Sequence, residues 1–380
     1  MAPDTRRTDH PLIPLVQATI TDADRRCLAS FVARELEYAP DRKILDLEQE
    51  VAATLGVADA VAVSSGTAAL HLALMALGIR LEHEVIVPSY TCVALLNAVH
   101  LCGAQPVIAD NEYSLRDYQF APTVDHVRPL LTRSTRALIV SHTFGSLANI
   151  ALGGSLDLPM IEDFTLSLGA RRNGRMAGSW GTIGVASLHA SKMISAGQGG
   201  IVVSQDKRLI KRVRELSSSE RRIVGWRSAS ARALRGKYAP AANYQMSGLQ
   251  AALALSQWKQ LPAFIRRRRL LARRYTKVFR QLGIPCPEVP GDRSNIFYRY
   301  MIAVPGGVHK LIADLAAERV ELGRGVFPPL HLLLGLPDKH FPGAMKCVNS
   351  LISVPLYPAL RDVDAAYLMD TLRETFLKPR

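Results

Sequence analysis

A lysine flanked by serines, Lys192, is the first candidate for chemistry in this chain. It ends the stretch SLHASK at 187–192, and the glycine-rich stretch GQGG at 197–200 then leads into an apolar segment. The amine of a lysine can attack a carbonyl carbon and form an imine, which is one route of covalent catalysis. A lysine in such a sequence can equally be an ordinary surface charge, so the pattern alone leaves both roles open.

A turn of small residues, SSGTAAL at 64–70, is the second candidate. Gly66 and Thr67 stand where a strand is expected to give way to a helix. Small side chains let backbone N–H groups approach an anion, and the N-terminus of a helix carries a partial positive charge. The same residues also suit a simple N-cap, in which a side-chain oxygen binds the first turn of the helix.

Two further polar motifs stand next to predicted elements. Glu162 and Asp163 directly follow an apolar segment, so a carboxylate is expected at the end of a strand, where ligands bind. Capping of the next helix is the alternative role for these acids. Asn243 opens the stretch NYQM at 243–246, just before a long predicted helix, and the start of a capped helix is the simplest interpretation there.

Short apolar segments alternate with helical stretches through the first two thirds of the chain. Strands are expected at residues 60–63, 84–87, 106–109, 137–140, 158–161 and 200–203. Helices are expected between them, for example at 67–77 and 91–101. This alternation is typical of βαβ units and predicts a mostly parallel sheet covered by helices. Ligands of such sheets bind at the carboxyl ends of the strands.

The pattern changes after residue 216. A stretch rich in Ser, Arg and Gly is expected to be irregular, and a long helix follows from 247 to about 281. Residues 295–380 indicate a smaller α+β unit. We therefore expect a large domain over 1–245, whose N-terminal segment packs partly on the small domain. The remaining residues, 246–380, would form the linking helix and the small domain.

The composition fits an ordinary globular protein with a basic surface. The 380 residues are 48% hydrophobic and 21% charged, which excludes disorder, collagen and coiled coil. The net charge of +14, from 47 basic and 33 acidic residues, should attract anions: nucleic acid, phosphorylated metabolites or an acidic membrane surface. Four arginines could line the mouth of a site for an anionic small-molecule substrate, or form a solvated surface: Arg221, Arg222, Arg227 and Arg232. The run Arg266–Arg269 has no interleaved aromatic residues, so nucleic acid is not expected as a partner.

The cysteines and the N-terminus indicate a cytoplasmic location. Five scattered cysteines without metal-site spacing suggest reduced thiols: Cys27, Cys92, Cys102, Cys286 and Cys347. The N-terminal residues lack the apolar region of a signal peptide. No apolar run reaches the roughly 20 residues that a membrane span needs. We therefore expect a cytoplasmic protein that binds neither a metal nor a membrane.

In order and spacing, these motifs resemble those of the DegT/DnrJ/StrS family of sugar aminotransferases, which are fold-type I pyridoxal phosphate enzymes. The matching stretches are VAVSSGTAAL, EVIVPSYTCVALLNAVHLCGAQPVIAD, IVSHTFG, IEDFTLSLGARRNGRMAGSWG, SLHASKMISAGQGGIVV, NYQMSGLQAALALSQWKQL, VFPPLHLL and LISVPLYPAL. They span nearly the whole chain, and eight stretches in register make chance similarity negligible. The resemblance implies an α/β fold of fold-type I, with a mostly parallel central sheet covered by helices and a smaller C-terminal α+β domain.

The resemblance also implies roles in binding pyridoxal 5′-phosphate. Lys192 would carry the cofactor as an imine and then move protons as general base and acid. Asp163 would pair with the pyridinium nitrogen and keep it protonated, so that the ring can accept electrons. Gly66, Thr67 and Ser187 would bind the phosphate group of the cofactor.

A homodimer with a composite active site is a further implication of the resemblance. Asn243 would reach across the interface to the cofactor phosphate of the neighbouring subunit. His142 and Tyr90 fall near the cofactor by the same comparison, and a packing role suits each of them equally.

Four positions depart from the family pattern. Leu166 stands where a glutamine usually lies beside the phenolic oxygen of the cofactor. Cys92 stands where an aromatic residue usually covers the cofactor ring, and a thiol can contact the ring but cannot stack on it. Gln198 and Gln245 replace a usual glutamate and arginine close to where the substrate enters. These changes predict an intact cofactor site and a diverged substrate site.

The activity implied is transfer of an amino group from glutamate or glutamine to a keto-sugar or cyclitol, most often nucleotide-linked, in amino-sugar or antibiotic biosynthesis. An enzyme of the same fold that carries out elimination, dehydration or oxidation is the alternative. Lys192 argues against the family's dehydratases, in which a histidine replaces the lysine. A regulatory protein that binds the cofactor as a sensor is a third alternative, which the intact Lys192 and Asp163 disfavour.

Overall fold

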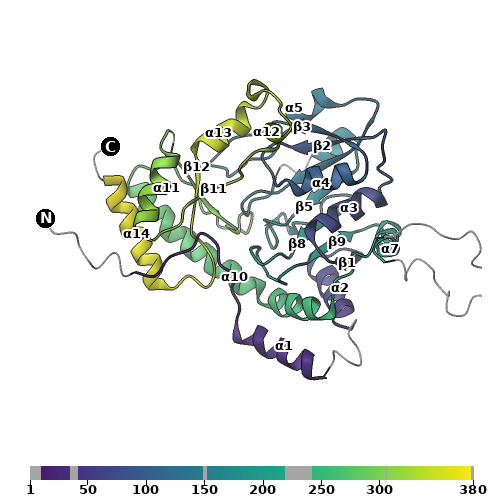
Figure 1. Cartoon of the computed structure of the whole chain (residues 1–380), viewed down its shortest axis with the longest axis horizontal. Helices are drawn as coiled ribbons and strands as arrows, with labels where there is room; N and C mark the ends of the chain where they lie inside the picture. The colour runs from purple at the N-terminus through teal and green to yellow at the C-terminus, as the bar shows by residue number, and fades with distance from the viewer. Residues whose placement is uncertain (1–9, 35–41, 149–151, 219–241, 305, 378–380) are drawn as a thin grey trace, which may run out of the picture.

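A seven-stranded sheet forms the centre of the larger part of the molecule (Figure 1). The computed structural model describes residues 10–34, 42–148, 152–218, 242–304 and 306–377. The strand order is β1-β9-β8-β5-β4-β2-β3. The strands are β1 Asp59–Val63, β2 Glu84–Pro88, β3 Gln105–Ala109, β4 Thr135–Ser141, β5 Met160–Asp163, β8 Ile183–Ser187 and β9 Gly200–Ser204.

The expected mostly parallel sheet is confirmed. Strands β3, β2, β4, β5 and β8 pair in parallel, whereas β9 pairs antiparallel with both β8 and β1. Because β2, β4, β5 and β8 run in one direction, their carboxyl ends meet at one edge of the sheet. A small hairpin of two short strands follows β5: β6 Arg171–Arg172 and β7 Arg175–Met176.

Alternate residues of the strands supply two separate apolar layers. Val61 and Val63 of β1 pack in one core, and Ala60 and Ala62 pack in the other. Burial on both faces requires a helix layer on each side of the sheet. The first core includes α3 Gly66–Ala76, α4 Ala94–Leu101 and α7 Lys207–Leu216. The opposite face is covered by α2 Arg42–Leu55, α5 Val124–Val127, α6 Leu152–Leu156 and the first half of α10 Gly248–Gln281.

A second, smaller sheet stands beside the large one. Strands β10 Tyr300–Ala303, β12 Leu351–Val354 and β11 Gly323–Arg324 pair antiparallel in that order. The helices of this part are α11 Val308–Ala317, α12 Leu330–Leu333, α13 Pro342–Ser350 and α14 Asp362–Leu377. Two single 3-10 turns complete the described elements, at Arg128–Leu130 and Asp338–His340.

Helix α10 runs through both parts of the molecule. Ser247 caps it by accepting a hydrogen bond from Gln250 N, while the Gln250 side chain accepts one from Ser247 N. Its first half packs on the large sheet, and Leu271, Tyr275 and Phe279 pack against the small sheet. The helix expected from 247 to about 281 is therefore confirmed.

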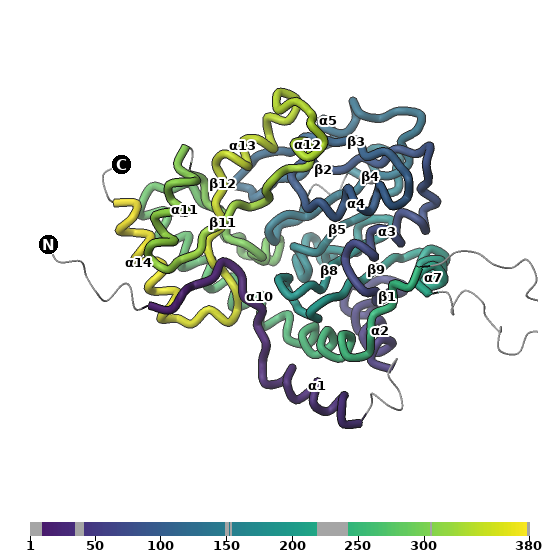
Figure 2. The backbone as a smooth tube through the Cα atoms, in the orientation of Figure 1, coloured from purple at the N-terminus to yellow at the C-terminus, as the bar shows by residue number. Residues whose placement is uncertain are grey.

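The N-terminal segment reaches the small sheet before the chain turns into α1 Asp22–Arg34 (Figure 2). Ile13 N donates to Arg319 O, and Glu321 N donates to Ile13 O. Helix α1 then lies along α10, where buried Asp24 accepts hydrogen bonds from Ser256 and Gln257. The boundary expected after residue 245 stays a prediction.

Some predicted bounds are wrong by a few residues. Strand β5 begins at Met160, two residues later than expected, and α4 begins at Ala94, three residues later. Strand β8 was not expected from the sequence. It contains Gly184, a residue that weakens strand patterns, yet a Cβ there would lie only 2.5 Å from Gly178 O. The glycine is required by the close approach of two backbones.

Candidate active site

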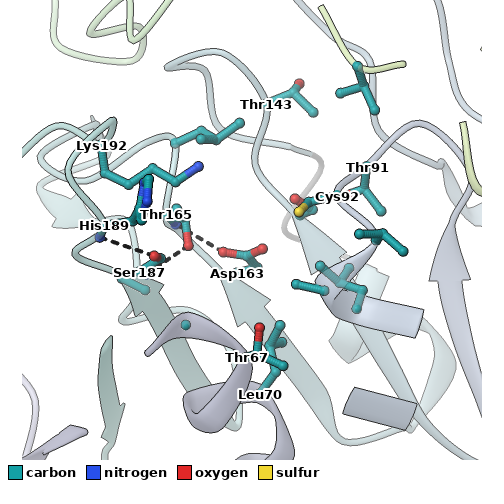
Figure 3. A pocket seen from close by; sticks show the side chains of 18 of the residues that line it. Thr67, Leu70, Thr91, Cys92, Thr143, Asp163, Thr165, Ser187, His189 and Lys192 are labelled. Carbon is teal, nitrogen blue, oxygen red and sulfur yellow. Dashed lines mark hydrogen bonds between the residues drawn. The ribbon is translucent and has the colours of Figure 1, made fainter. Parts of the chain in front are cut away.

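A cavity of about 750 Å³ opens at the carboxyl edge of the large sheet. Its floor comes from the ends of β4, β5 and β8 and from residues that follow β2, β4, β5 and β8. Its far wall comes from the segment just before β10 and the loop after β11. Of the seven residues that the sequence analysis placed at the catalytic or cofactor site, all except Asn243 line this cavity: Gly66, Thr67, Cys92, Asp163, Ser187 and Lys192. In Figure 3, the side chains of Lys192, Thr165, Ser187 and Asp163 lie on one side of the cavity, and those of Thr91 and Cys92 lie across from them.

Lys192 is held in the loop between β8 and β9. Its backbone N–H donates to His189 O at 2.9 Å, and its Nζ lies 5.8 Å from the centre of the Tyr298 ring. Lys192 lines the cavity and is only half-buried. An amine placed this way can reach a carbonyl group of a molecule bound in the cavity.

Asp163 is the last residue of β5 and is almost fully buried. Its Oδ1 accepts a hydrogen bond from Thr165 N at 3.0 Å. Burial raises the pKa of Asp163, against the opposing effects of the Thr165 hydrogen bonds and the positive charge of Lys192. A cationic partner bound at this carboxylate would favour its ionised form. The alternative of capping a helix is wrong for Asp163, since a turn follows β5.

The turn after β1 combines the two roles that the sequence left open. Ser65 Oγ accepts a hydrogen bond from Ala68 N at 3.1 Å and so caps α3. Gly66 is the first helical residue, and a Cβ there would lie 2.6 Å from the Cβ of Ser187. Glycine is therefore needed for the helix N-terminus to approach β8 so closely. The first backbone N–H groups of a helix have no partner within the helix and can bind an anion.

Comparisons with known proteins agree with this arrangement. The profile of the DegT/DnrJ/EryC1/StrS aminotransferase family matches residues 28–373. The chain belongs to this family. Its members are pyridoxal phosphate-dependent aminotransferases, which confirms the enzyme class and the fold expected from the sequence.

Individual relatives match the chain over most of its length. A GDP-perosamine synthase of Caulobacter vibrioides is 31% identical over 344 residues, which cover 85% of this chain and 87% of that protein. Another, of Escherichia coli O157:H7, is 27% identical over 388 residues, covering 96% and 98%. The crystal structure of S. venezuelae DesV in complex with a ketimine intermediate superposes with a TM-score of 0.84, at 27% identity, covering 98% of this chain and 100% of that one.

Three of the departures from the family pattern face the cavity. Leu166, Cys92 and Gln198 all line it. Cys92 is an exposed thiol, whereas Leu166 packs partly against the core of the large sheet. Gln245 instead forms an isolated bridge with Val63 at the end of β1. Three of the four positions at which the sequence suggested a departure from the family pattern therefore lie in the wall of the cavity.

Asn243 is exposed and is not among the residues that line the cavity of its own chain. The next residue, Tyr244, accepts a hydrogen bond from Ser64 N at 2.8 Å through its carbonyl oxygen. This contact fixes the backbone beside Asn243 near the turn that precedes α3. A contact of Asn243 with a second chain stays a prediction.

His142 and Tyr90 have different places near the cavity. His142 is fully buried and does not line it; its Nε2 lies 2.8 Å from Glu162 Oε1, and its Nδ1 accepts a hydrogen bond from Ala148 N. Tyr90 lines the cavity but is fully buried, and its hydroxyl accepts a hydrogen bond from Val326 N. Both residues thus have packing partners within the chain.

The sequence did not indicate the residues that reach the cavity from the segments next to the small sheet. Tyr298, Arg299 and Phe327 line the cavity from this side. The run of arginines on α10 gave an indirect signal, because Arg268 is buried and its Nη1 donates to Tyr298 O at 2.8 Å. Arg269 similarly donates to Asn295 O. Part of the run therefore holds the segment that carries Tyr298 and Arg299.

Several predictions concern features that lie elsewhere. The four arginines proposed for the substrate mouth lie outside the described residues: Arg221, Arg222, Arg227 and Arg232. All five cysteines lie within the described residues, and none of them forms a disulfide. Within the described ranges, no group of three or more potential metal ligands comes together. Among the helices described, none combines the length and the apolar character needed to cross a membrane.

Proposed function

We propose that this chain binds pyridoxal 5′-phosphate at Lys192 and transfers an amino group from glutamate or glutamine to the keto group of a nucleotide-linked sugar. The observation that carries the proposal is the convergence of Lys192, Asp163 and the N-terminus of α3 on one cavity. These three features offer an amine, a carboxylate and an anion-binding helix end. They match the aldehyde, the ring nitrogen and the phosphate of this cofactor.

The shape of the chain also fits the cofactor. Gly66 lies so close to Ser187 that any side chain at position 66 would collide with it, and this approach leaves the helix N-terminus and a serine hydroxyl side by side. Thr67 lies in the same first turn of α3. These residues would hold the phosphate, and Cys92 would contact the ring from the opposite wall.

Each residue then has a definite task. Bound pyridoxal phosphate supplies an electron sink for the carbanion formed at the substrate carbon. The Asp163 carboxylate would hold a proton on the ring nitrogen, and the low-polarity surroundings that raise its pKa strengthen that charge pair. The Lys192 amine, once released, would remove a proton from one carbon and deliver it to another.

A sugar substrate is supported by the relatives. Two of them carry the name GDP-perosamine synthase, which refers to a nucleotide-linked sugar. The basic net charge of +14 suits such an anionic substrate. A cytoplasmic location and a division into domains at residue 245 remain predictions beside this proposal.

A different reaction on the same fold is the second candidate. Leu166 in the cavity wall cannot donate the hydrogen bond that a glutamine would offer to the phenolic oxygen of the cofactor. Elimination, dehydration or oxidation of the substrate would then replace amino transfer. Mass spectrometry of reactions with keto-sugars and glutamate separates the candidates, because transfer yields an amino-sugar and 2-oxoglutarate together.

The first test of the proposal is covalent trapping. Borohydride added to the reconstituted protein should fix the cofactor on Lys192, and peptide mapping should locate it there. Lys192→Ala should still bind the cofactor but turn over no substrate, while Lys259→Ala, an exposed lysine of α10, serves as the control. Reduced cofactor on another residue would contradict the assignment.

We further propose that the active site is shared within a homodimer through Asn243. A mixture of Lys192→Ala and Asn243→Ala chains tests this, because in a heterodimer one site carries both changes and the other carries neither. Activity should therefore reappear on mixing. If subunits exchange but no activity returns, Asn243 serves its own chain.

A further inference from the structure

Arg299 is a charged residue of the cavity that the proposed function has not used. It follows Tyr298 just before β10, is half-buried, and lines the cavity. Among the described lining residues, only Lys192 and Arg299 carry a lysine or arginine charge. Since Lys192 is committed to the cofactor, Arg299 is the cation available to a substrate.

The guanidinium of Arg299 is fixed in place without being neutralised. Its Nη1 donates to Arg324 O at 3.0 Å and to Gly325 O at 3.1 Å. No carboxylate of the described residues forms an ion pair with it. An arginine has five N–H donors, so the remaining donors can bind a further group as a planar fork. This geometry favours a carboxylate, which arginine binds through two parallel hydrogen bonds.

Arg299 and Lys192 both lie near the ring of Tyr298. The Cζ of Arg299 is 5.9 Å from the centre of the Tyr298 ring, and Lys192 Nζ is 5.8 Å from the same ring. Burial alone would raise the pKa of Tyr298, but the positive charges of Lys192, Arg299 and Arg268 lower it. Because both cations lie within about 6 Å of one ring centre, an anion held by Arg299 would lie at the same part of the cavity wall as Lys192.

We infer that Arg299 binds the α-carboxylate of the amino donor. In an α-amino acid this carboxylate is only two bonds from the nitrogen that reacts at Lys192. The phosphates of a nucleotide-linked sugar are separated from its keto carbon by bonds of the sugar ring and lie farther from the lysine. The inference rests on the proposed function, and it adds a residue that sets the class of donor: an α-amino acid, not a simple amine.

The test is a titration of the reconstituted enzyme, followed by the change in cofactor absorbance. L-glutamate is compared with L-isoglutamine, in which the α-carboxylate is a neutral amide. Arg299→Gln should raise the apparent Kd for glutamate by about 30-fold or more, since truncating one member of a partly buried charge pair costs at least about 2 kcal/mol. Isoglutamine should bind both proteins equally weakly. Arg299→Lys keeps the positive charge but lacks the planar guanidinium, so its Kd for glutamate should lie between those of the wild type and Arg299→Gln.

Arg324→Gln is the matched control. Its guanidinium lies 4.2 Å from the centre of the Phe327 ring and contacts His309, and Arg324 does not line the cavity. This variant should keep the Kd of the wild type for glutamate. Circular dichroism and the visible spectrum of each variant check that the fold and cofactor binding persist.

Several outcomes would overturn the inference. An unchanged Kd for glutamate in Arg299→Gln rejects it, and so does an equal loss for glutamate and isoglutamine. Weaker binding of GDP, measured by calorimetry, together with normal glutamate binding would assign Arg299 to the nucleotide phosphates instead. If the reconstituted wild type, shown in a separate borohydride-treated sample to carry the cofactor on Lys192, responds to no amino donor, the proposed function itself fails.

Discussion

Two neighbouring carboxylates on β5, Glu162 and Asp163, show how one strand serves two purposes. Glu162 is fully buried on the closed side, where its oxygens accept hydrogen bonds from His142 and from the backbone N–H groups of Gly178, Trp180 and Gly181. Asp163 points the opposite way and lines the cavity. Successive strand residues face opposite sides of a sheet, so adjacent acids meet entirely different surroundings.

The two side chains differ in how completely they are satisfied. Burial would raise the pKa of Glu162, but its hydrogen bonds, beginning with His142, lower it. For Asp163, burial outweighs the hydrogen bonds from Thr165 and raises the pKa. A carboxylate whose hydrogen bonds are all made within the protein stabilises the fold. One that is buried and only partly bonded is poised for a cationic ligand.

The sharpest test of this contrast is Asp163→Asn. A neutral amide cannot stabilise a proton on the ring nitrogen of the cofactor, so activity should fall by about a hundredfold or more, as when an electrostatic element of an active site is removed. Cofactor binding and thermal stability should persist. Turnover close to that of the wild type would mean that Asp163 has only a structural role.

Glu162→Gln, in contrast, should lower the stability of the fold. It removes the charge that four donors share and places an amide N–H against them, so the free energy of unfolding should fall by about 3 kcal/mol. Chemical denaturation of the protein without cofactor measures this. Glu82→Gln, at an exposed position paired with Arg80, should change stability by less than about 0.5 kcal/mol. A similar small change for Glu162→Gln would refute the structural role.

The pH dependence of stability should distinguish the same two acids. Because the folded-state pKa of Glu162 is lowered, its contribution is present above its ordinary value of 4.5 and is lost as the pH falls through the folded-state pKa. The difference in unfolding free energy between wild type and Glu162→Gln should therefore shrink below about pH 4.5. The pKa of Asp163 is raised instead, so its ionisation destabilises the folded protein as the pH rises above the ordinary value of 3.8. The stability of Asp163→Asn relative to the wild type should therefore increase above pH 3.8. A pH-independent difference for both variants would contradict this assignment.

The smallest expected effect concerns Thr165, whose hydrogen bonds lower the pKa of Asp163. Thr165→Val should raise that pKa further, so the acidic limb of the kcat/KM profile should move to higher pH by about 0.5 to 1, which corresponds to one lost hydrogen bond. Activity at neutral pH should change little. Thr165→Ser retains the hydroxyl and should keep the profile of the wild type; a shift of equal size in both variants would argue against the hydrogen bond.

The sequence predicted those parts of the fold that depend on local pattern. Strands such as β1 and β9 follow from short apolar runs, and the capping serine of α3 follows from its position before a helix. Asp163 was found because it directly follows an apolar segment, and Lys192 because serines flank it and a glycine-rich turn follows it. The sequence pattern could not predict β8, because Gly184 interrupts its apolar run. That glycine is needed only because the folded chain brings the backbone of Gly178 close to it.

Residues that reach the site from the small sheet were also beyond the sequence. Tyr298 and Arg299 lie more than a hundred residues from Lys192, and no local motif marks them. The run of arginines on α10 was considered only as evidence on nucleic acid, yet Arg268 is buried and donates hydrogen bonds to three carbonyl groups. Burial lowers its pKa to about 10. Its role depends on tertiary contacts that composition does not encode.

Helix α10 has a consequence for how the molecule could be divided. Its 34 residues would extend about 50 Å at the rise of an α-helix, and they contribute apolar side chains to two cores in succession. A cut at residue 245 would leave the large sheet without Trp258 and Leu261, and would give the small part an uncovered apolar half-helix. The two parts should therefore unfold together in a denaturant titration, and neither half should accumulate alone when expressed separately.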